Sequence, residues 1–208
     1  MEKQAVFKLS YGLYVISSSY DGEDSACIAN TLAQVTSEPM QLSVTVNKNN
    51  FTTSLIMQSK LFNGAVLLDK VDMDTIARFG FQSGKDVDKF DGIDYTVDSK
   101  GLKQIKDNIA ATFTCKVVKS LDVGTHMIFI GEVVDAKVVS DEPVLTYENY
   151  HTKKKGTTPK NAATYVEETK VKGYRCGVCG YVLEADELPE DFVCPICKQP
   201  ASVFEKVE

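Results

Sequence analysis

Cys176-Gly-Val-Cys179 and Cys194-Pro-Ile-Cys197 are two Cys-x-x-Cys pairs that lie about fourteen residues apart. Each pair can fold into a tight turn whose sulfur atoms point the same way, and two such turns facing each other form a tetrahedral cage that selects Zn²⁺ or iron. Gly180 follows the first pair, where a residue that can adopt a positive φ lets backbone N–H groups turn toward the thiolates. The sequence therefore predicts a metal site at Cys176, Cys179, Cys194 and Cys197, with two structural disulfides as the alternative.

The composition is that of an ordinary globular protein. The chain has 208 residues, of which 43% are hydrophobic and 25% charged, enough for one good-sized domain and one small one. A formal net charge of −6 leaves no electrostatic footprint for nucleic-acid binding. No apolar run reaches the length of roughly eighteen residues that predicts a membrane span. The first residues contain no apolar signal core, so we expect a cytoplasmic protein whose paired cysteines bind metal.

The residues before the cysteine pairs are predicted to form a mainly β domain. Runs of β-forming residues alternate with polar turns and predict strands over residues 11–19, 25–35, 41–46, 64–69, 110–119 and 126–139. Gly131 indicates a bulge or bend in the last of these. Two short helices are expected over residues 51–59 and 72–79, the first capped by Asn50 or Thr52. Many short strands and few helices favour a small β-barrel.

Residues 149–172 have a different composition, basic, polar and turn-forming around Lys153-Lys154-Lys155. Such a segment is typical of a linker or extended arm between two folded units, which places a domain boundary near residue 170. The lysines are expected to be solvated, and a steering patch for an acidic partner or a phosphate is the alternative. The acid pair Glu167-Glu168 is also expected to be solvated.

One stretch of the first domain has the features of a phosphate site. Residues 47–52, Asn-Lys-Asn-Asn-Phe-Thr, join the end of an expected strand to the start of an expected helix. Free backbone N–H groups, a lysine and a hydroxyl at such a turn could hold a phosphate. No Gly-x-Gly-x-x-Gly motif follows a strand, so a Rossmann dinucleotide site is not predicted.

The cysteine region resembles a known family. Tyr174-Arg175 precedes the first cysteine, Gly180-Tyr181 follows the first pair, and Glu-Asp-Phe-Val-Cys-Pro occupies residues 190–195. Residues 172–207 thus resemble the rubredoxins, in the shortened form found at the end of rubrerythrins. The resemblance implies one iron on the four cysteines, carrying one electron between Fe²⁺ and Fe³⁺. Lys198 departs from the family, which often has glycine there, and a zinc ribbon is the alternative.

The first domain resembles the flavin reductase-like proteins, whose fold is a Greek-key split β-barrel that binds FMN. The resemblance rests on Ser-Ala-Cys-Ile-Ala-Asn-Thr-Leu at residues 25–32, Val-Thr-Ser-Glu-Pro at 35–39, Asp-Val-Gly-Thr-His at 122–126 and Ile-Gly-Glu-Val at 130–133. It implies a division into a split barrel over residues 1–150, a linker over 151–171 and a rubredoxin-like iron domain over 172–208.

The resemblance also implies site residues. Contacts to the flavin ring fall on Ala29, Asn30, Thr31, Leu32 and Gln34, and contacts to the phosphate fall on Asn47, Lys48 and Thr52. His126 corresponds to a family histidine near the nicotinamide side of the flavin and is the candidate catalytic residue. Cys27 stands where the family has glycine, so its sulfur lies beside the flavin or simply packs in the strand. Cys115 is expected to pack in the core.

Together the two modules resemble the high-molecular-weight rubredoxins, which implies an electron-transfer function. A nicotinamide gives up two electrons as hydride and a single iron accepts one, whereas a flavin exchanges either number. The resemblance implies transfer from NAD(P)H, or another low-potential donor, through FMN to the iron and then to a protein acceptor such as a flavodiiron oxygen or nitric oxide reductase. It further implies a homodimer. The alternatives are a flavin reductase with a structural zinc ribbon and a flavin-binding sensor.

Overall fold

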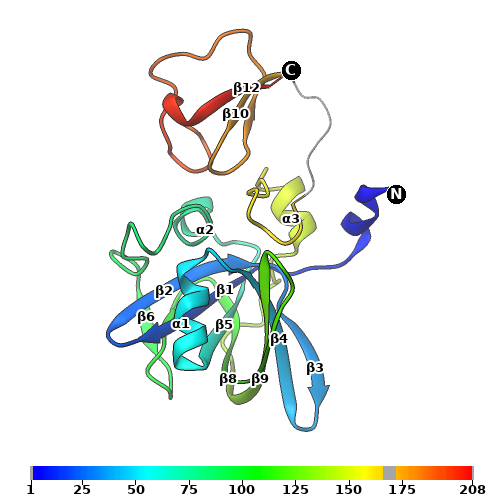
Figure 1. The fold of residues 1–208 in the computed structure, drawn as a ribbon, viewed down its shortest axis with the longest axis vertical. Coiled ribbons are helices and arrows are strands. Elements are labelled where there is room, and N and C mark those ends of the chain that lie inside the picture. Colours follow the sequence, from blue (N-terminus) through cyan, green and yellow to red (C-terminus); the bar gives the residue numbers. More distant parts are fainter. Residues whose placement is uncertain (1, 166–171, 208) are drawn as a thin grey trace.

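The computed structural model describes residues 2–165 and 172–207. Most of the chain forms one seven-stranded antiparallel sheet with the strand order β2-β1-β5-β8-β9-β4-β3 (Figure 1). The strands are β1 (Tyr14–Tyr20), β2 (Glu23–Ala29), β3 (Ala33–Ser37), β4 (Met40–Asn47), β5 (Leu61–Leu67), β8 (Ile109–Asp122) and β9 (His126–Val138). The sheet curls so that β2 also contacts β4. This arrangement confirms the predicted mainly β, Greek-key split barrel.

The prediction of one strand over residues 25–35 is wrong. The chain forms β2, breaks over Asn30-Thr31-Leu32, and resumes as β3. Cys27, Asn30 and Leu32 are 3%, 8% and 8% exposed, a spacing that one continuous strand with alternating faces cannot produce. The hydroxyl of Thr31 donates to the carbonyl of Thr45 in β4 (2.8 Å) and anchors the break.

The two expected helices are present, and side chains cap both. Helix α1 (Phe51–Ser59) begins after Asn50, whose side chain accepts from the N–H of Thr52 (3.0 Å). Helix α2 (Met73–Gly80) begins after Asp72, whose carboxylate accepts from the N–H of Thr75 (2.6 Å). Helix α1 packs on β1 and β2, and α2 packs on β2. The sequence did not predict the following short elements: η1 (Lys3–Lys8), β6 (Tyr95–Val97), β7 (Lys103–Ile105) and α3 (Tyr147–Thr152).

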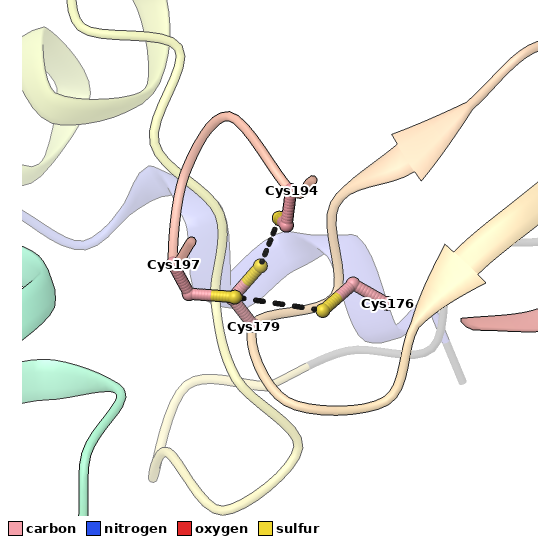
Figure 2. A group of neighbouring side chains, drawn as sticks. All are labelled: Cys176, Cys179, Cys194 and Cys197. Carbon is pink, nitrogen blue, oxygen red and sulfur yellow. Dashed lines mark hydrogen bonds between the residues drawn. The ribbon is translucent and has the colours of Figure 1, made fainter. Parts of the chain in front are cut away.

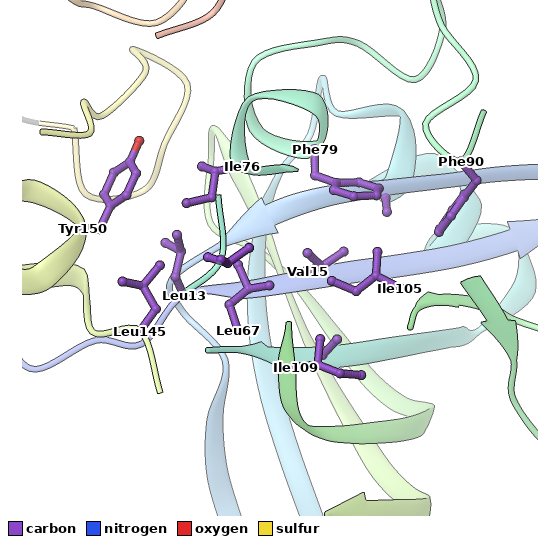
Figure 3. Close-up of a cluster of buried hydrophobic side chains, with 13 residues drawn as sticks. Leu13, Val15, Leu67, Ile76, Phe79, Phe90, Ile105, Ile109, Leu145 and Tyr150 are labelled. Carbon is purple, nitrogen blue, oxygen red and sulfur yellow. The ribbon is translucent and has the colours of Figure 1, made fainter. Parts of the chain in front are cut away.

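Two apolar clusters form the core of the barrel. One fills the space between α2, β1 and β5, with Tyr150 at one end and its hydroxyl directed toward the segment after α3 (Figure 3). The other surrounds Phe62 and Phe129 and includes Cys27 and Cys115. Burial raises the pKa of Cys115 to about 12 and that of Cys27 to about 11, so both thiols are neutral. Cys115 packs as predicted, and Cys27 also lies in the core.

Gly131 lies at an irregular point of the sheet, as the sequence indicates. The β8–β9 register shifts between Val117 and Lys119, and Gly131 pairs with Val117 beside that shift. A Cβ at Gly131 would lie 2.7 Å from the ring of Phe62 and 2.7 Å from Cβ of Cys115. Glycine is therefore required at this position because the second core cluster approaches the backbone closely.

A buried lysine fixes the loop that follows α2. Lys89 is 1% exposed, and its ammonium group donates to the carbonyl of Arg78 (2.6 Å) and to that of Phe79 (3.2 Å). These carbonyls belong to the last turn of α2, where a cation is favourable. Burial nevertheless lowers the pKa of Lys89 to about 8.

The depressed pKa of Lys89 predicts a pH dependence of stability. The unfolded chain holds this proton up to about pH 10, whereas the folded chain releases it near pH 8, so folding becomes more favourable as the pH rises through this window. In Lys89→Met this component is absent. We expect the free energy of unfolding of the original chain, measured by urea denaturation, to rise through this pH window relative to that of Lys89→Met. The rise should be up to about 1.4 kcal/mol per pH unit. The control is Lys119→Met, at an exposed position: the difference in unfolding free energy between the original chain and this variant should not change with pH. Parallel pH profiles for the original chain and Lys89→Met would contradict the assignment.

The C-terminal residues form a separate small sheet with the order β11-β10-β12. Its strands are β10 (Gly173–Cys176), β11 (Val182–Leu183) and β12 (Phe204–Val207), and the short helix η2 (Ala201–Val203) precedes β12. Residues 153–165, which follow helix α3, are here called the arm. Helix α3 and the arm lie between this unit and the barrel (Figure 1). The pair Glu167-Glu168 and the boundary predicted near residue 170 lie outside the described residues. Among the described helices, none has the length and apolar character needed to cross a membrane.

Candidate metal centre and adjoining cavity

The four cysteines of the two pairs converge in the C-terminal unit (Figure 2). Their sulfur atoms all lie within 4.8 Å of one another, and all four residues are buried. Sγ of Cys176 lies 3.6 Å from Sγ of Cys197, and Sγ of Cys179 lies 3.6 Å from Sγ of Cys194. In a tetrahedral site with metal–sulfur distances of about 2.3 Å, neighbouring sulfurs are about 3.8 Å apart. The spacing therefore fits one tetrahedral metal ion.

Backbone N–H groups are directed toward three of these sulfurs, those of Cys176, Cys179 and Cys197, as the sequence predicted. The thiol of Cys176 accepts from the backbone of Val178 and Cys179, and that of Cys197 accepts from the backbone of Gln199. Gly180 has the positive φ, 84°, that the first turn requires. Burial raises the pKa of Cys197 to about 12 and also raises that of Cys179, whereas at Cys176 burial is outweighed by accepted hydrogen bonds, which lower the pKa, so the thiols do not all ionise without a cation between them. The donor set thus suits a thiophilic metal.

Lys198 occupies the position in the second turn that corresponds to Gly180, and its φ is also positive, 59°. A side chain in this left-handed conformation costs roughly 1 kcal/mol. We therefore expect Lys198→Gly to stabilise the metal-loaded unit by about 0.5 to 1 kcal/mol. Resistance to urea, followed through metal–thiolate absorbance, measures the change. The control is Lys206→Gly in β12, which should weaken the same unit, and a loss of stability in Lys198→Gly would contradict the strain.

A cavity of about 340 Å³ lies between the barrel and the metal-binding turns. The ends of β2 and β4, the start of α1 and the loop after α2 form its barrel side. The arm and the first metal-binding turn form the opposite side, through Thr157, Thr158, Asn161, Thr164, Gly177 and Val178. Two units that are separate in sequence therefore share one cavity.

Four of the predicted flavin-site residues line this cavity: Ala29, Asn30, Asn47 and His126. The side-chain amide of Asn30 donates to the hydroxyl of Thr164 (2.9 Å), and that of Asn47 donates to the carbonyl of Asn161 (3.0 Å). The arm is thus held across the cavity by the strand ends. Nδ1 of His126 lies 2.8 Å from the hydroxyl of Thr125.

The other predicted contacts do not line this cavity. Leu32 is in the second core cluster, Gln34 lies on the exposed strand β3, and Thr31 anchors the strand break. Lys48 forms an ion pair with Asp122, and Thr52 is buried against the hydroxyl of Ser25 (3.2 Å). Thr31, Lys48 and Thr52 are next in sequence to residues that line the cavity, whereas Gln34 is not.

The sequence did not identify the loop after α2 as part of the site. Gly80, the last residue of α2, and residues 81–84 of this loop line the cavity beside the start of α1. A Cβ at Gly84 would lie 2.2 Å from Oγ of Ser25 and 3.2 Å from the ring of Phe51, so only glycine allows this approach. The glycines at 80 and 84 were a visible signal, but their spacing does not match a phosphate-loop motif.

The cavity has the chemistry that a flavin nucleotide needs. Apolar side chains of Ile28, Val46 and Ile76 line one part, which suits an aromatic ring system. Asn50, at the start of α1, and Ser83 also line the cavity and supply polar groups, which suit the polar end of a flavin nucleotide. The residues present therefore fit a flavin nucleotide.

A second cavity, of about 680 Å³, lies between η1, α3, the arm and the C-terminal unit. It shares Tyr147, Thr157, Thr158 and Thr164 with the first cavity. The ring of Tyr147 meets those of Tyr11 and His151 edge-on and forms part of the partition.

In comparisons with known proteins, the barrel and the C-terminal unit match two different family models. Residues 6–156 match the flavin reductase like domain, and residues 174–205 match the rubredoxin-like domain of rubrerythrin. The high molecular weight rubredoxin of Moorella thermoacetica is 36% identical over 229 aligned positions, which cover 100% of both chains. The ferric-chelate reductase (NAD(P)H) of Archaeoglobus fulgidus is 43% identical over 167 residues, covering 80% of this chain and 99% of that protein.

Solved structures share the barrel fold. The NADH:FAD oxidoreductase of Streptomyces globisporus superimposes with a TM-score of 0.63 at 21% identity, covering 69% of this chain and 85% of that one. Flavoredoxin of Methanosarcina acetivorans gives a TM-score of 0.58 at 21% identity, covering 64% and 74%.

The split barrel with its cavity and the four-cysteine unit define a two-domain oxidoreductase that combines a flavin site with a metal site. The combination of the flavin reductase-like barrel with the four-cysteine unit is the distinguishing feature. The chain belongs to the high-molecular-weight rubredoxin family, within the flavin reductase-like proteins.

Proposed function

We propose that this protein takes electrons from NAD(P)H, or another low-potential donor, onto FMN in the 340 Å³ cavity and passes them to one iron held by the four cysteines. A protein acceptor such as a flavodiiron oxygen or nitric oxide reductase then receives them. The observation that supports this most directly is that Gly177 and Val178, which separate two metal ligands, line the same cavity as Ala29 and Asn30. FMN supplies the conversion between two-electron and one-electron transfer when it is bound.

In this proposal the residues that line the cavity, and the predicted contacts near them in sequence, have distinct roles. Ala29 and Asn30 hold the flavin ring at the end of β2, with Thr31, Leu32 and Gln34 setting the course of the chain beyond it. Asn47 and the start of α1 hold the phosphate, with Lys48 as the nearby cation and Thr52 bracing the turn. His126, at the start of β9, lines the cavity and orients the nicotinamide. Because split barrels of this type pair, we expect a homodimer.

Analysis of the purified full-length protein tests the proposal. We expect bound flavin, one iron for the four cysteines, and loss of both the flavin and the iron absorbance when NADH is mixed in rapidly. The control is Cys194→Ala, in which the flavin should still bleach without an iron signal. Zinc in place of iron, or an iron centre that stays oxidised while the flavin is reduced, would exclude this function.

A second candidate is a flavin reductase in which the cysteine unit holds zinc for structure or docking. The observation that favours it is the identity of 43% to a relative named as a ferric-chelate reductase (NAD(P)H). Stoichiometric zinc, with rapid NADH-dependent reduction of ferric citrate, would support this candidate. Bound iron, with fast transfer to a flavodiiron protein, would support the first.

A further inference from the structure

We propose that Thr157 is a positioning residue that latches the first metal-binding turn, residues 176–180, onto the barrel, so that flavin in the cavity and the docked metal unit stabilise each other. The proposal rests on the proposed function, because it takes the ligand of the cavity to be a flavin. It assigns to the arm a role beyond that of a tether.

The latch is a short chain of hydrogen bonds that runs from the barrel core to a metal ligand. The hydroxyl of Tyr150 donates to the carbonyl of Thr157 (2.8 Å), and the hydroxyl of Thr157 donates to the carbonyl of Cys179 (2.7 Å). Tyr150 is 3% exposed and belongs to the first core cluster. Thr157 is therefore fixed to the rigid barrel through its backbone and to the metal-binding turn through its side chain.

The arm and the turn also approach each other closely. Gly180 has a φ of 84°, and a Cβ there would lie 3.3 Å from the carbonyl oxygen of Thr158. Met73 and Phe81, from the two ends of α2, pack against the cluster of cysteines. The ion pair between Lys198 and Asp74 (3.9 Å) is exposed at both ends and adds little. Among the described residues, the contact thus rests on one directed hydrogen bond, from Thr157 to Cys179, and a small apolar patch.

The position of the cavity couples this contact to ligand binding. Asn30 and Asn47 reach across from the barrel to Thr164 and Asn161 of the arm, the segment that carries Thr157. Val178 completes the wall on the metal side. A ligand that touches both walls binds the docked arrangement more tightly than the undocked one. By linkage, docking then raises the affinity for that ligand by the same factor.

The first test measures FMN affinity by fluorescence titration of the full chain. Thr157→Val keeps the shape of the side chain and removes the hydroxyl, and we expect the dissociation constant for FMN to rise roughly 2- to 10-fold. Thr157→Ser should restore it. The matched control is Thr36→Val, because Thr36 also donates to a carbonyl, that of Pro39 (2.6 Å), but lies at an exposed hairpin far from the cavity. Unchanged affinity in Thr157→Val would overturn the proposal.

The second measurement separates the latch from a direct contact between Thr157 and flavin. Amide hydrogen exchange at residues 177–180 should slow when FMN is added to the unaltered chain. In flavin-free Thr157→Val, exchange at these amides should already be faster than in the flavin-free original, with equal metal content. If FMN binds but leaves this exchange unchanged, the latch is wrong and the proposed function stands. If the chain binds no flavin, both fall.

Discussion

Replacing Cys194 with alanine is expected to abolish metal binding and to unfold residues 172–207 while the barrel remains folded. Within its described residues, the C-terminal unit has only a three-stranded sheet, and its buried hydrophobic side chains are the four cysteines and Ile196. A unit of this size does not bury enough apolar surface to fold without its metal. The binding free energy of a structural metal, about 10–16 kcal/mol in small zinc domains, is then the free energy that holds the unit together.

Metal content per chain and amide exchange in the two units measure this effect. The control is Cys115→Ala, which also removes a buried thiol but from the barrel core, and it should keep full metal content. A Cys194→Ala protein that retains one metal ion and slow exchange in β10 and β12 would contradict the expectation.

Replacing Phe62 with alanine should cost about 3–5 kcal/mol of barrel stability, the usual range for a large aromatic side chain removed from a core. Phe62 is 0% exposed, lies on β5, and packs in the cluster with Phe129 and Cys115. Its ring also fills the space against Gly131 on the neighbouring part of the sheet. Urea denaturation followed by far-UV circular dichroism measures the loss.

The contact between Phe62 and Gly131 makes this prediction sharper. Gly131→Ala alone should cost about 1–3 kcal/mol, because its methyl group meets the Phe62 ring. In the Phe62→Ala background the cost should shrink, with a coupling energy of about 1 kcal/mol. Gly101→Ala is the control, since a Cβ there meets nothing within 4 Å and only the positive φ opposes it. Costs of Phe62→Ala and Gly131→Ala that simply add would contradict the packing.

The parts of the fold that were predicted depend on local signals. The metal site follows from two fixed spacings, and the helices follow from residues at their starts, the cap Asn50 of the first and the acids Asp72 and Asp74 of the second. The break at Asn30 was missed because it depends on which side chains the rest of the barrel buries. The hairpin of β6 and β7 was missed because β6 is exposed and short.

The candidate site was predictable in part. Resemblance to a family placed Ala29, Asn30, Asn47 and His126 at the cavity. The opposite wall has no local signature, because Asn30 and its partner Thr164 are 134 positions apart and polar residues in a basic segment favour a solvated linker. Contacts of this kind appear only when the two units are placed in space.

Tethering the two units changes how strong their contact has to be. A short connection holds the metal unit near the barrel at an effective concentration of order millimolar. A docking interaction of only about −4 kcal/mol, too weak to join separate molecules in dilute solution, would then keep the units together about half of the time. The small patch around Thr157 and Gly180 suits such a balance. Under the proposed function, such a weak contact would leave the metal unit free to meet its protein acceptor for part of the time, which a large permanent interface would prevent.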